Sequence, residues 1–289
     1  MTIVVTGASG HLGRLVVESL LERGVPAADI RALGRSEQKL AALADRGVQT
    51  ATIDFDKPET LDAAFDGADA LLLVSASEPG KRVPQHKNAI DAAVRSGVGH
   101  IVYTSAPHAT DTALVLAPEH KATEELLAES GLPVTVLRNN WYTENYVGQL
   151  DTAGQSGEIV ASAGDGRVAS ATRKDYAEAA AVVLTTPGHE GAVYELTGDE
   201  AWAFTDLAAA VGTILGRDVA YRPVSPEEHT AILTGAGLDE GTAGFVVALD
   251  GNIRDGALAE ATSTLSDLIG RPTTRLIDGL EQAREAVTV

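Results

Sequence analysis

Apolar and polar positions follow a regular beat along the first 140 residues of the chain. Residues 70–74 read Ala-Leu-Leu-Leu-Val, an unbroken apolar run typical of a strand that is buried on both faces of a parallel sheet. The pattern predicts strands over residues 3–5, 30–33, 48–53, 70–74, 101–103 and 134–137, and helices over residues 12–21, 37–43, 59–65, 84–96 and 119–130. Strands separated by helices indicate βαβ units, and therefore an α/β, Rossmann-type, doubly wound parallel sheet.

The rhythm changes beyond Asn139. Residues 141–166 are rich in glycine and read as irregular, and residues 175–184 predict an alanine-rich helix that Asp175 would cap. Residues 193–196 read as a further strand of the main sheet. Helical patterns then dominate, over residues 206–215, 226–233, 238–249, 263–269 and 275–285.

These patterns predict two domains. A dinucleotide-binding domain is expected over residues 1–140, with residues 172–198 returning to it. A smaller, mostly helical substrate lobe is expected over residues 141–171 and 199–289. We expect this lobe to pack over the carboxyl ends of the strands, because ligands bind there in open α/β sheets.

A glycine-rich loop directly follows the first predicted strand and opens the first predicted helix. Its sequence, Thr6 to Gly13, places glycines with the spacing Gly-x-x-Gly-x-x-Gly. Gly7 permits a tight turn, Gly10 lets the backbone approach a pyrophosphate, and Gly13 lets the helix pack closely on the strand. The helix N-terminus adds N–H donors and a positive dipole end. The loop therefore predicts a dinucleotide site.

The end of the second predicted strand indicates which dinucleotide is preferred. NAD-specific sites normally carry an acidic residue there, whereas this chain has Leu33-Gly34-Arg35-Ser36, and no acidic residue stands at the strand end. Arg35 can pair with a 2′-phosphate, so NADP(H) is favoured over NAD(H). Asp54 follows the third strand, where it can either accept from the adenine amino group or cap the turn at residues 57–58.

Composition removes several classes of function. The formal net charge is −19, which argues against nucleic acid and anionic membranes as general partners. The absence of apolar runs of 18 or more residues predicts no membrane insertion, and the N-terminus lacks a signal-peptide pattern. The chain contains no cysteine, which fits a cytoplasmic protein, and its seven histidines show no zinc spacing, so no metal is expected.

With these residues in view, the chain resembles the atypical short-chain dehydrogenase/reductases of the NmrA-like group, and within it the type 2 NAD(P)H:quinone oxidoreductases. The segments that carry the resemblance run almost from end to end and include TGASGHLG, SASEPGKRVPQHKNAIDAA, YTSAPHA, EHKATEELLAESG, LRNNWYTENY, GDGRVASATRKDYAEAAA, YELTGDEAW and LIGRPTT. The resemblance implies an NADPH-binding Rossmann domain and two-electron reduction of a quinone. It also implies a cofactor-binding set of Gly7, Ala8, Ser9, Gly10, His11, Leu12, Arg35, Ser75, Ala76, Ser77, Asn139, Asn140, Trp141 and Arg173, with Arg173 near the far end of the cofactor or the substrate.

The chain lacks the Tyr-x-x-x-Lys pair of the wider superfamily, since none of its tyrosines has a lysine four residues later. At the position where NmrA-like reductases often carry a lysine, this chain has His120. Reduction of a ketone creates an alkoxide, whose conjugate acid has a pKa of roughly 15.7. Reduction of a quinone creates a phenolate-like anion with a pKa near about 10, which needs roughly 8 kcal/mol less charge stabilisation. The missing tyrosine therefore favours a quinone.

Four residues are candidates for the acceptor site. Tyr142 can stack on a planar ring and Asn145 can bond a quinone oxygen. Packing between the lobes is the alternative role for these aromatic side chains, as favoured as stacking for Trp141 but less favoured for Tyr142. Ser105 stands at the end of the fifth strand, where the superfamily places a catalytic hydroxyl, but a turn serine fits as well. His120 can donate a proton or be an ordinary helix histidine.

The sequence thus predicts an NADPH-dependent oxidoreductase that transfers a hydride to a small-molecule quinone. A non-catalytic NADP(H)-binding redox sensor of the NmrA-like type is the alternative. A sugar-nucleotide epimerase would need the missing Tyr-Lys pair. A homo-oligomer is among the states that the sequence allows.

Overall fold

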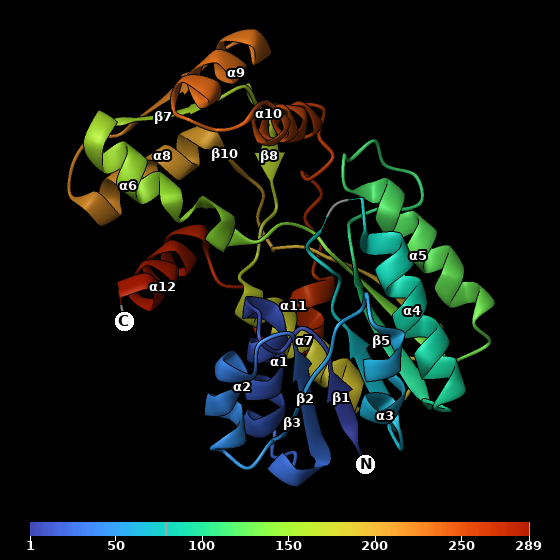
Figure 1. Ribbon diagram of the computed structural model, residues 1–289. Coiled ribbons are helices and arrows are strands. Elements are labelled where there is room, and N and C mark those ends of the chain that lie inside the picture. The colour runs from blue at the N-terminus through green and yellow to red at the C-terminus, as the bar shows by residue number, and fades with distance from the viewer. Residues whose placement is uncertain (79, 289) are drawn as a thin grey trace. The chain divides into compact units, whose positions relative to one another are not determined.

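The computed structural model describes residues 1–78 and 80–288. Within these residues a parallel seven-stranded sheet has the order β3-β2-β1-β4-β5-β6-β9 (Figure 1). Its strands are β1 (Ile3–Val5), β2 (Ile30–Gly34), β3 (Gln49–Thr52), β4 (Ala70–Leu73), β5 (His100–Ser105), β6 (Val134–Asn139) and β9 (Val193–Leu196). The strand order runs outward from β1 in both directions, which confirms the expected Rossmann-type sheet.

Helices connect these strands and cover the sheet. They are α1 (His11–Glu22), α2 (Glu37–Ala44), α3 (Asp62–Phe65), α4 (Arg82–Arg95), α5 (Ala117–Glu129) and α7 (Arg173–Thr185), with 3₁₀ turns η1 (Ala27–Asp29) and η2 (Pro58–Thr60). Helix α4 packs against both α3 and α5, and α1 packs against α7. The expectation that Asp175 caps its helix is wrong, because α7 begins two residues earlier and buries Asp175 in its first turn.

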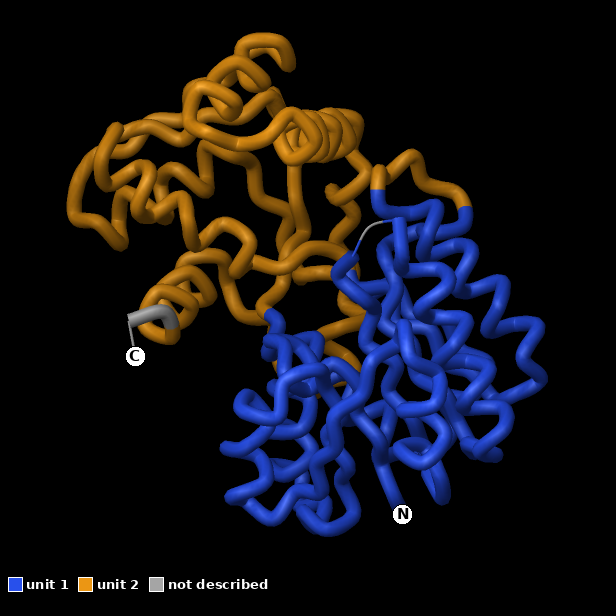
Figure 2. Tube along the Cα trace, viewed as in Figure 1, with its two compact units in different colours: residues 1–110, 116–139, 173–196 blue, residues 111–115, 140–172, 197–289 orange. Residues whose placement is uncertain are grey.

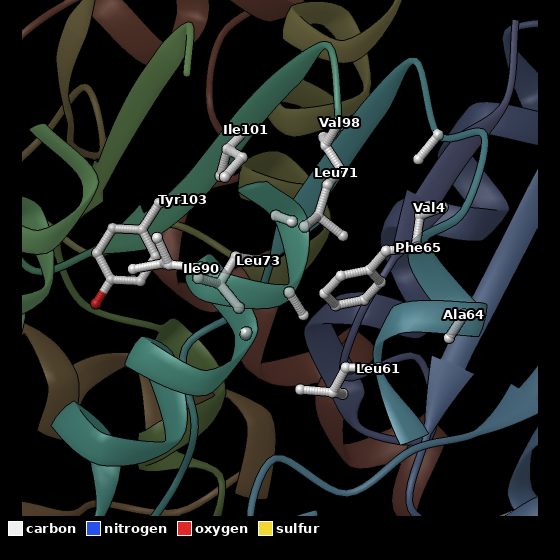
Figure 3. Packing of buried hydrophobic residues seen from close by; sticks show 14 of the residues in the cluster. Val4, Leu61, Ala64, Phe65, Leu71, Leu73, Ile90, Val98, Ile101 and Tyr103 are labelled. Carbon is white, nitrogen blue, oxygen red and sulfur yellow. The ribbon is translucent and has the colours of Figure 1, made fainter. Parts of the chain in front are cut away.

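The core between the sheet and helices α3 and α4 is built from aliphatic side chains around Phe65 (Figure 3). All four residues of β4 are buried, as an apolar run in the middle of a parallel sheet requires. Leu71, Leu73 and Phe65 are each fully excluded from solvent. Burial of one such side chain contributes about 1.5–3 kcal/mol, so this cluster fixes the strand ends on which the loops are mounted.

The chain divides into two compact units, which Figure 2 distinguishes by colour. The first unit holds residues 1–110, 116–139 and 173–196, and therefore the whole seven-stranded sheet. The second unit holds residues 111–115, 140–172 and 197–289. The chain passes from one unit to the other directly after β6 and directly before α7.

The second unit combines helices with two small sheets. Strand β7 (Glu158–Ala161) pairs in parallel with β11 (Ala220–Pro223), and β8 (Arg167–Val168) pairs antiparallel with β10 (Trp202–Ala203). Its other elements are η3 (Thr143–Tyr146), α6 (Gly148–Ser156), α8 (Phe204–Leu215), α9 (Pro226–Gly235), α10 (Glu240–Arg254), α11 (Thr264–Ile269) and α12 (Leu276–Thr288). The expectation of an irregular segment over residues 141–166 is therefore wrong, since it contains η3, α6 and β7.

A buried aromatic group and a buried polar group hold the second unit together. Tyr146 meets Trp202 edge to face at a centroid distance of 4.9 Å. Asp250 Oδ2 accepts from the backbone N–H of Ser162 at 2.6 Å and lies 3.0 Å from His229 Nδ1. The contacts of Asp250 join the residue that follows β7 to α9 and α10. Ser162 Oγ and Asp250 Oδ2 both contact the same ring nitrogen of His229, Nδ1, and they also contact each other. In a serine-hydrolase triad the serine and the aspartate contact opposite ring nitrogens, so these three residues do not form such a triad.

Candidate cofactor site

The glycine loop is held to neighbouring strands by the buried side chain of Thr6. Its hydroxyl donates to the carbonyl of Leu72 at 3.0 Å and accepts from the backbone N–H of Val74, also at 3.0 Å. The N–H of Ala8 donates to the carbonyl of Leu33 at 2.8 Å. The loop is therefore tied to β4 on one side and to β2 on the other.

Two of the loop glycines are required by geometry. Gly7 has a φ of +65°, which side-chain-bearing residues rarely adopt. A Cβ on Gly13 would lie 2.5 Å from the carbonyl oxygen of Gly7, so only glycine lets α1 approach the loop this closely. Both observations agree with the roles that the sequence motif predicts.

The start of α1 offers N–H donors for an anion. Gly10 is the N-cap, and within the described residues no side chain caps this helix end. The first-turn N–H groups of a helix have no intrahelical partners, and the helix dipole adds positive potential there. Gly10 and His11 are exposed, whereas Ala8 and Leu12 are buried beneath them and Ser9 is half-buried. This arrangement fits a bound pyrophosphate.

Arg35 directly follows β2 and is exposed, and it forms an ion pair. Its guanidinium pairs with the carboxylate of Glu78, which follows β4 and lies 43 positions away in the sequence. Lys81 Nζ lies 3.3 Å from the other carboxylate oxygen, and these two cations hold the pKa of Glu78 below its ordinary value. The end of β2 itself carries no acidic residue, as the sequence shows, but the fold brings one there from another loop.

Asp54 lies after β3 in a local turn. Its Oδ1 accepts from the backbone N–H of Asp56 at 3.0 Å, and Lys57 Nζ lies 3.7 Å from its Oδ2. The N-cap of η2 is Lys57, so Asp54 is not the helix cap. It stabilises the turn by the hydrogen bond from its side chain to the backbone two residues later. Its role toward adenine stays a prediction.

The loop after β4 is fixed by three side chains from two other elements, β5 and α4. The N–H of Ser75 donates to Thr104 Oγ1 at 2.9 Å, and the N–H of Ala76 donates to His86 Nε2 at 2.9 Å. Arg82 Nε donates to the carbonyl of Ala76 at 2.8 Å. Ser77 follows these anchored residues directly. We call residues 75–78 and 80, with these ties, the clamped loop.

His86 is the centre of this arrangement. Because its Nε2 accepts from Ala76, its proton must be on Nδ1, which faces Thr123 Oγ1 at 2.9 Å. Thr123 in turn donates to the carbonyl of Glu119 at 2.8 Å. Each of these three consecutive hydrogen bonds therefore has one donor and one acceptor. Burial, reinforced by the positive charge of Arg82, lowers the pKa of His86 to about 3. The ring is therefore neutral at neutral pH.

The two catalytic candidates in the first unit are both engaged inside the protein. Ser105 donates its hydroxyl to Glu124 Oε1 at 2.6 Å, and Glu124 also pairs with Arg138. His120 is buried, its Nδ1 lies 2.8 Å from Tyr103 Oη, and burial lowers its pKa to about 3. A histidine with so low a pKa is almost entirely neutral at pH 7 and is a poor source of protons.

The remaining candidates lie where the chain passes between the two units. Asn139 ends β6 and is buried, and Arg173 begins α7 and is half-buried, both in the first unit. Asn140 is buried in the second unit, where its amide nitrogen donates to the carbonyls of Ala169 and Leu258 at 3.1 and 3.2 Å. These bonds fix the first residue after β6.

Trp141, Tyr142 and Asn145 form the next stretch of the second unit. The N–H of Ala171 donates to the carbonyl of Trp141 at 3.1 Å, and Tyr142 forms a parallel bridge with Ala171. The N–H of Asn145 donates to the carbonyl of Tyr142 at 3.0 Å, which closes the turn η3. Trp141 and Tyr142 are half-buried and Asn145 is exposed. The backbone of this segment is thus well fixed.

Sequence reasoning missed the residues that shape the site from a distance. Glu78 pairs with Arg35, and Glu119 accepts from the N–H of Gly80 at 2.9 Å and pairs with Arg82 at 3.1 Å. His86 holds the clamped loop through its bond to the N–H of Ala76. The residues carry no local signal, because each acts on a partner far away in the sequence.

Comparison with known proteins identifies the class. The model of the NAD(P)H-binding family matches residues 7–187, which is more than half of the chain, so the chain belongs to this family. Within the described residues, no helix has the length and apolar character to cross a membrane, and no group of three or more His, Asp or Glu side chains is arranged to hold a metal ion.

Individual relatives are similar over nearly the whole chain. Quinone oxidoreductase 2 of Escherichia coli (strain K12) is 45% identical over 278 residues, which cover 96% of this chain and 97% of that protein. The crystal structure of an E. coli NADPH-dependent quinone oxidoreductase complexed with NADPH has a TM-score of 0.93 and covers 97% of this chain and 99% of its own, at 45% identity. Citrobacter sp. triphenylmethane reductase complexed with NADP(H) also has a TM-score of 0.93, at 39% identity, covering 98% of this chain and all of that one.

Proposed function

We propose that this chain is an NADPH-dependent oxidoreductase that reduces a quinone-type acceptor by hydride transfer. One observation carries the proposal: an uncapped helix N-terminus and Arg35 stand at the ends of β1 and β2 in a chain that is 45% identical to a quinone oxidoreductase almost from end to end. The first feature suits a pyrophosphate and the second a 2′-phosphate.

The cofactor is assigned to the first unit and to the residues that follow β6. Backbone N–H groups between Gly7 and Leu12 would bind the pyrophosphate, Arg35 the 2′-phosphate and Asp54 the adenine. The clamped loop and Asn139 to Trp141, with Arg173, would contact the rest. Bound NADPH supplies the hydride, and the protein's part is to fix its position. The internal hydrogen bonds of the clamped loop support such a fixed platform.

For the acceptor we propose Tyr142 as the stacking residue and Asn145 as a hydrogen-bond donor to a quinone oxygen. The quinone takes the hydride from NADPH and one proton from solvent, which gives the hydroquinone and NADP⁺. Solvent can supply the proton because the phenolate-like product has a pKa near about 10. Ser105 and His120 are occupied by Glu124 and Tyr103, which supports a reaction without a protein acid.

The test is NADPH oxidation under anaerobic conditions against a panel of benzoquinones and naphthoquinones. Tyr142→Ala and Asn145→Ala should each lower kcat/KM for the quinone by about tenfold or more, while the Kd for NADPH stays within about threefold. Gln149→Ala, which removes an amide from the following helix, is the matched control and should leave turnover unchanged.

The same internal bonds of Ser105 and His120 also suit a non-catalytic NADP(H) sensor. The two functions separate cleanly in this experiment. A protein that binds NADPH tightly but reduces none of the quinones would be a sensor, and the reductase assignment would then be rejected.

A further inference from the structure

Glu78 is the one side chain of the clamped loop that pairs with Arg35. Its Oε1 contacts Arg35 Nη1, and its Oε2 lies 3.3 Å from Lys81 Nζ. The side chain of Arg35 is two-thirds exposed, at 66%, so a ligand from solvent can reach it beside the carboxylate. The loop after β4 thus places the carboxylate of Glu78 against Arg35, the cation that follows β2.

The position of Glu78 is imposed by its neighbours in the chain. On one side, the N–H and the carbonyl of Ala76 are bonded to His86 and Arg82. On the other side, the N–H of Gly80 donates to Glu119. The described residues that bear these bonds, Ala76 and Gly80, are therefore held by side chains of α4 and α5, and Glu78 contacts Arg35 from the loop to which they belong. A pair made between preorganised groups costs less conformational entropy than one between two free surface side chains.

We propose that Glu78 is a specificity-determining residue of the cofactor site, which lowers the preference for NADPH over NADH. The proposal rests on the function proposed above, in which Arg35 binds the 2′-phosphate. Phosphate and carboxylate compete for the N–H groups of a guanidinium, because each offers negatively charged oxygens that arginine binds by charge-assisted hydrogen bonds. A 2′-phosphate on Arg35 therefore shares the guanidinium with Glu78 or displaces it from Nη1, and in both cases it lies close to the negative charge of Glu78.

NADH meets no such competition. It lacks the phosphate, so the pair between Arg35 and Glu78 stays intact when it binds. A carboxylate at this edge of the sheet can also accept from the ribose 2′-hydroxyl, which is the role of the acidic residue in NAD-specific sites. When the phosphate takes Arg35, Lys81 still neutralises Glu78, because it contacts the other carboxylate oxygen. The two cations thus allow the site to accept either cofactor.

Calorimetric titration of the full chain with NADPH and with NADH tests this role without any need for turnover. Glu78→Gln keeps the shape of the side chain and removes its charge. It should raise the ratio of the Kd for NADH to the Kd for NADPH by about three- to tenfold, in the range expected for removing a competing ion pair and a like charge. The effect should shrink at about 1 M salt, where the Debye length is about 3 Å.

Glu22→Gln is the matched control, because Glu22 is exposed at the far end of α1 and its loss changes the net charge equally. Its cofactor ratio should equal that of the native chain. In an Arg35→Gln background, Glu78→Gln should have a much smaller effect on NADPH, since no pair remains to be broken.

Three outcomes would overturn the proposal. An unchanged ratio in Glu78→Gln would leave Glu78 as a structural tie between two loops. An undiminished effect in the Arg35→Gln background would assign the gain to net charge instead of competition for Arg35. Failure of the native chain to bind either dinucleotide would reject the proposed function itself, and with it this role, so the two failures are distinguishable.

Discussion

The two loops that follow β1 and β4 are both assigned to the cofactor, yet they are built in opposite ways. The loop after β1 relies on what its residues lack: a side chain at Gly10, a Cβ at Gly13 and a cap on α1. The clamped loop after β4 relies on added contacts, from Thr104, His86 and other buried or half-buried side chains.

This difference has a physical consequence. A pyrophosphate needs bare N–H groups, so the loop that binds it must leave its donors open and depends on steric room. A loop that only orients the cofactor can have its own N–H groups satisfied from within, and then it is rigid before the ligand arrives. A side chain at Gly10 should therefore affect binding with little loss of stability, whereas changes to the side chains that hold the clamped loop should affect stability first.

The largest effect is expected when the first loop is filled. Gly10 has extended backbone angles that valine also adopts, but its Cβ would lie 3.2 Å from the carbonyl of Gly7 and its branches would reach into the space above the loop. Gly10→Val should weaken NADPH binding by more than about a hundredfold, because two charge-assisted hydrogen bonds are each worth about 1.5–3 kcal/mol.

Calorimetry measures the affinity and circular dichroism checks that the fold persists. Leu21→Val, at the other end of α1, is a control that introduces a β-branched residue away from the glycine loop. Unchanged affinity in a folded Gly10→Val variant would remove the basis for the cofactor assignment.

How far the sequence predicts the molecule depends on the same distinction between local and distant causes. The glycine loop, the buried run of β4 and the strand return at β9 follow from local pattern, and the structure has all three. Strand β7 was missed because it is only four residues long and its pairing partner β11 lies some sixty residues later. A strand this short is defined by its partner more than by its own residues.

The site divides in the same way. Arg35 was recognisable as a candidate phosphate ligand because it directly follows the second strand of a dinucleotide-binding βαβ unit. Its pairing with Glu78, 43 positions away, required the tertiary structure. The same holds for Ser105 and His120, whose hydrogen bonds to Glu124 and Tyr103 cross between a strand and a helix. Residue type alone does not indicate that these side chains are hydrogen-bonded inside the protein.

The next largest effect is expected at His86, which holds the clamped loop. Its contribution to the free energy of unfolding should depend on pH. Burial lowers the pKa of His86 in the folded chain to about 3, whereas an unfolded histidine titrates near about 6.5. Below about pH 6.5 the unfolded chain therefore takes up a proton that the folded chain refuses. The contribution of neutral His86 is complete above about pH 6.5 and is lost as the pH falls toward 3, at about 1.4 kcal/mol per pH unit.

His86→Leu tests this point. It should lower the free energy of unfolding at pH 7 by about 2–4 kcal/mol, because the N–H of Ala76 and the hydroxyl of Thr123 lose their partner. It should also flatten the decline in stability between pH 6.5 and 5 by about one proton, as measured by urea titration at a series of pH values. An equally steep decline in the variant would show that His86 is protonated in the folded chain.

The smallest effect on turnover is expected at His120, although it stood among the catalytic candidates. Its ring nitrogen is bonded to Tyr103 in the buried interior, and its pKa of about 3 leaves it neutral at the pH of any assay near neutrality. His120→Ala should lower stability, because a buried hydrogen bond is lost, but kcat/KM for quinones should fall by only a few-fold, far less than the roughly hundredfold or more typical of losing an essential general acid.

Tyr103→Phe removes the same hydrogen bond from the other side and calibrates the part of the effect that is structural. Turnover of the two variants should therefore be similar when each is corrected for its folded fraction. A collapse of activity in His120→Ala alone, with normal folding and NADPH affinity, would mean that His120 delivers a proton during the reaction. A phenolate-like product has little need of such a donor, whereas an alkoxide does, so that result would reopen carbonyl reduction as the native chemistry.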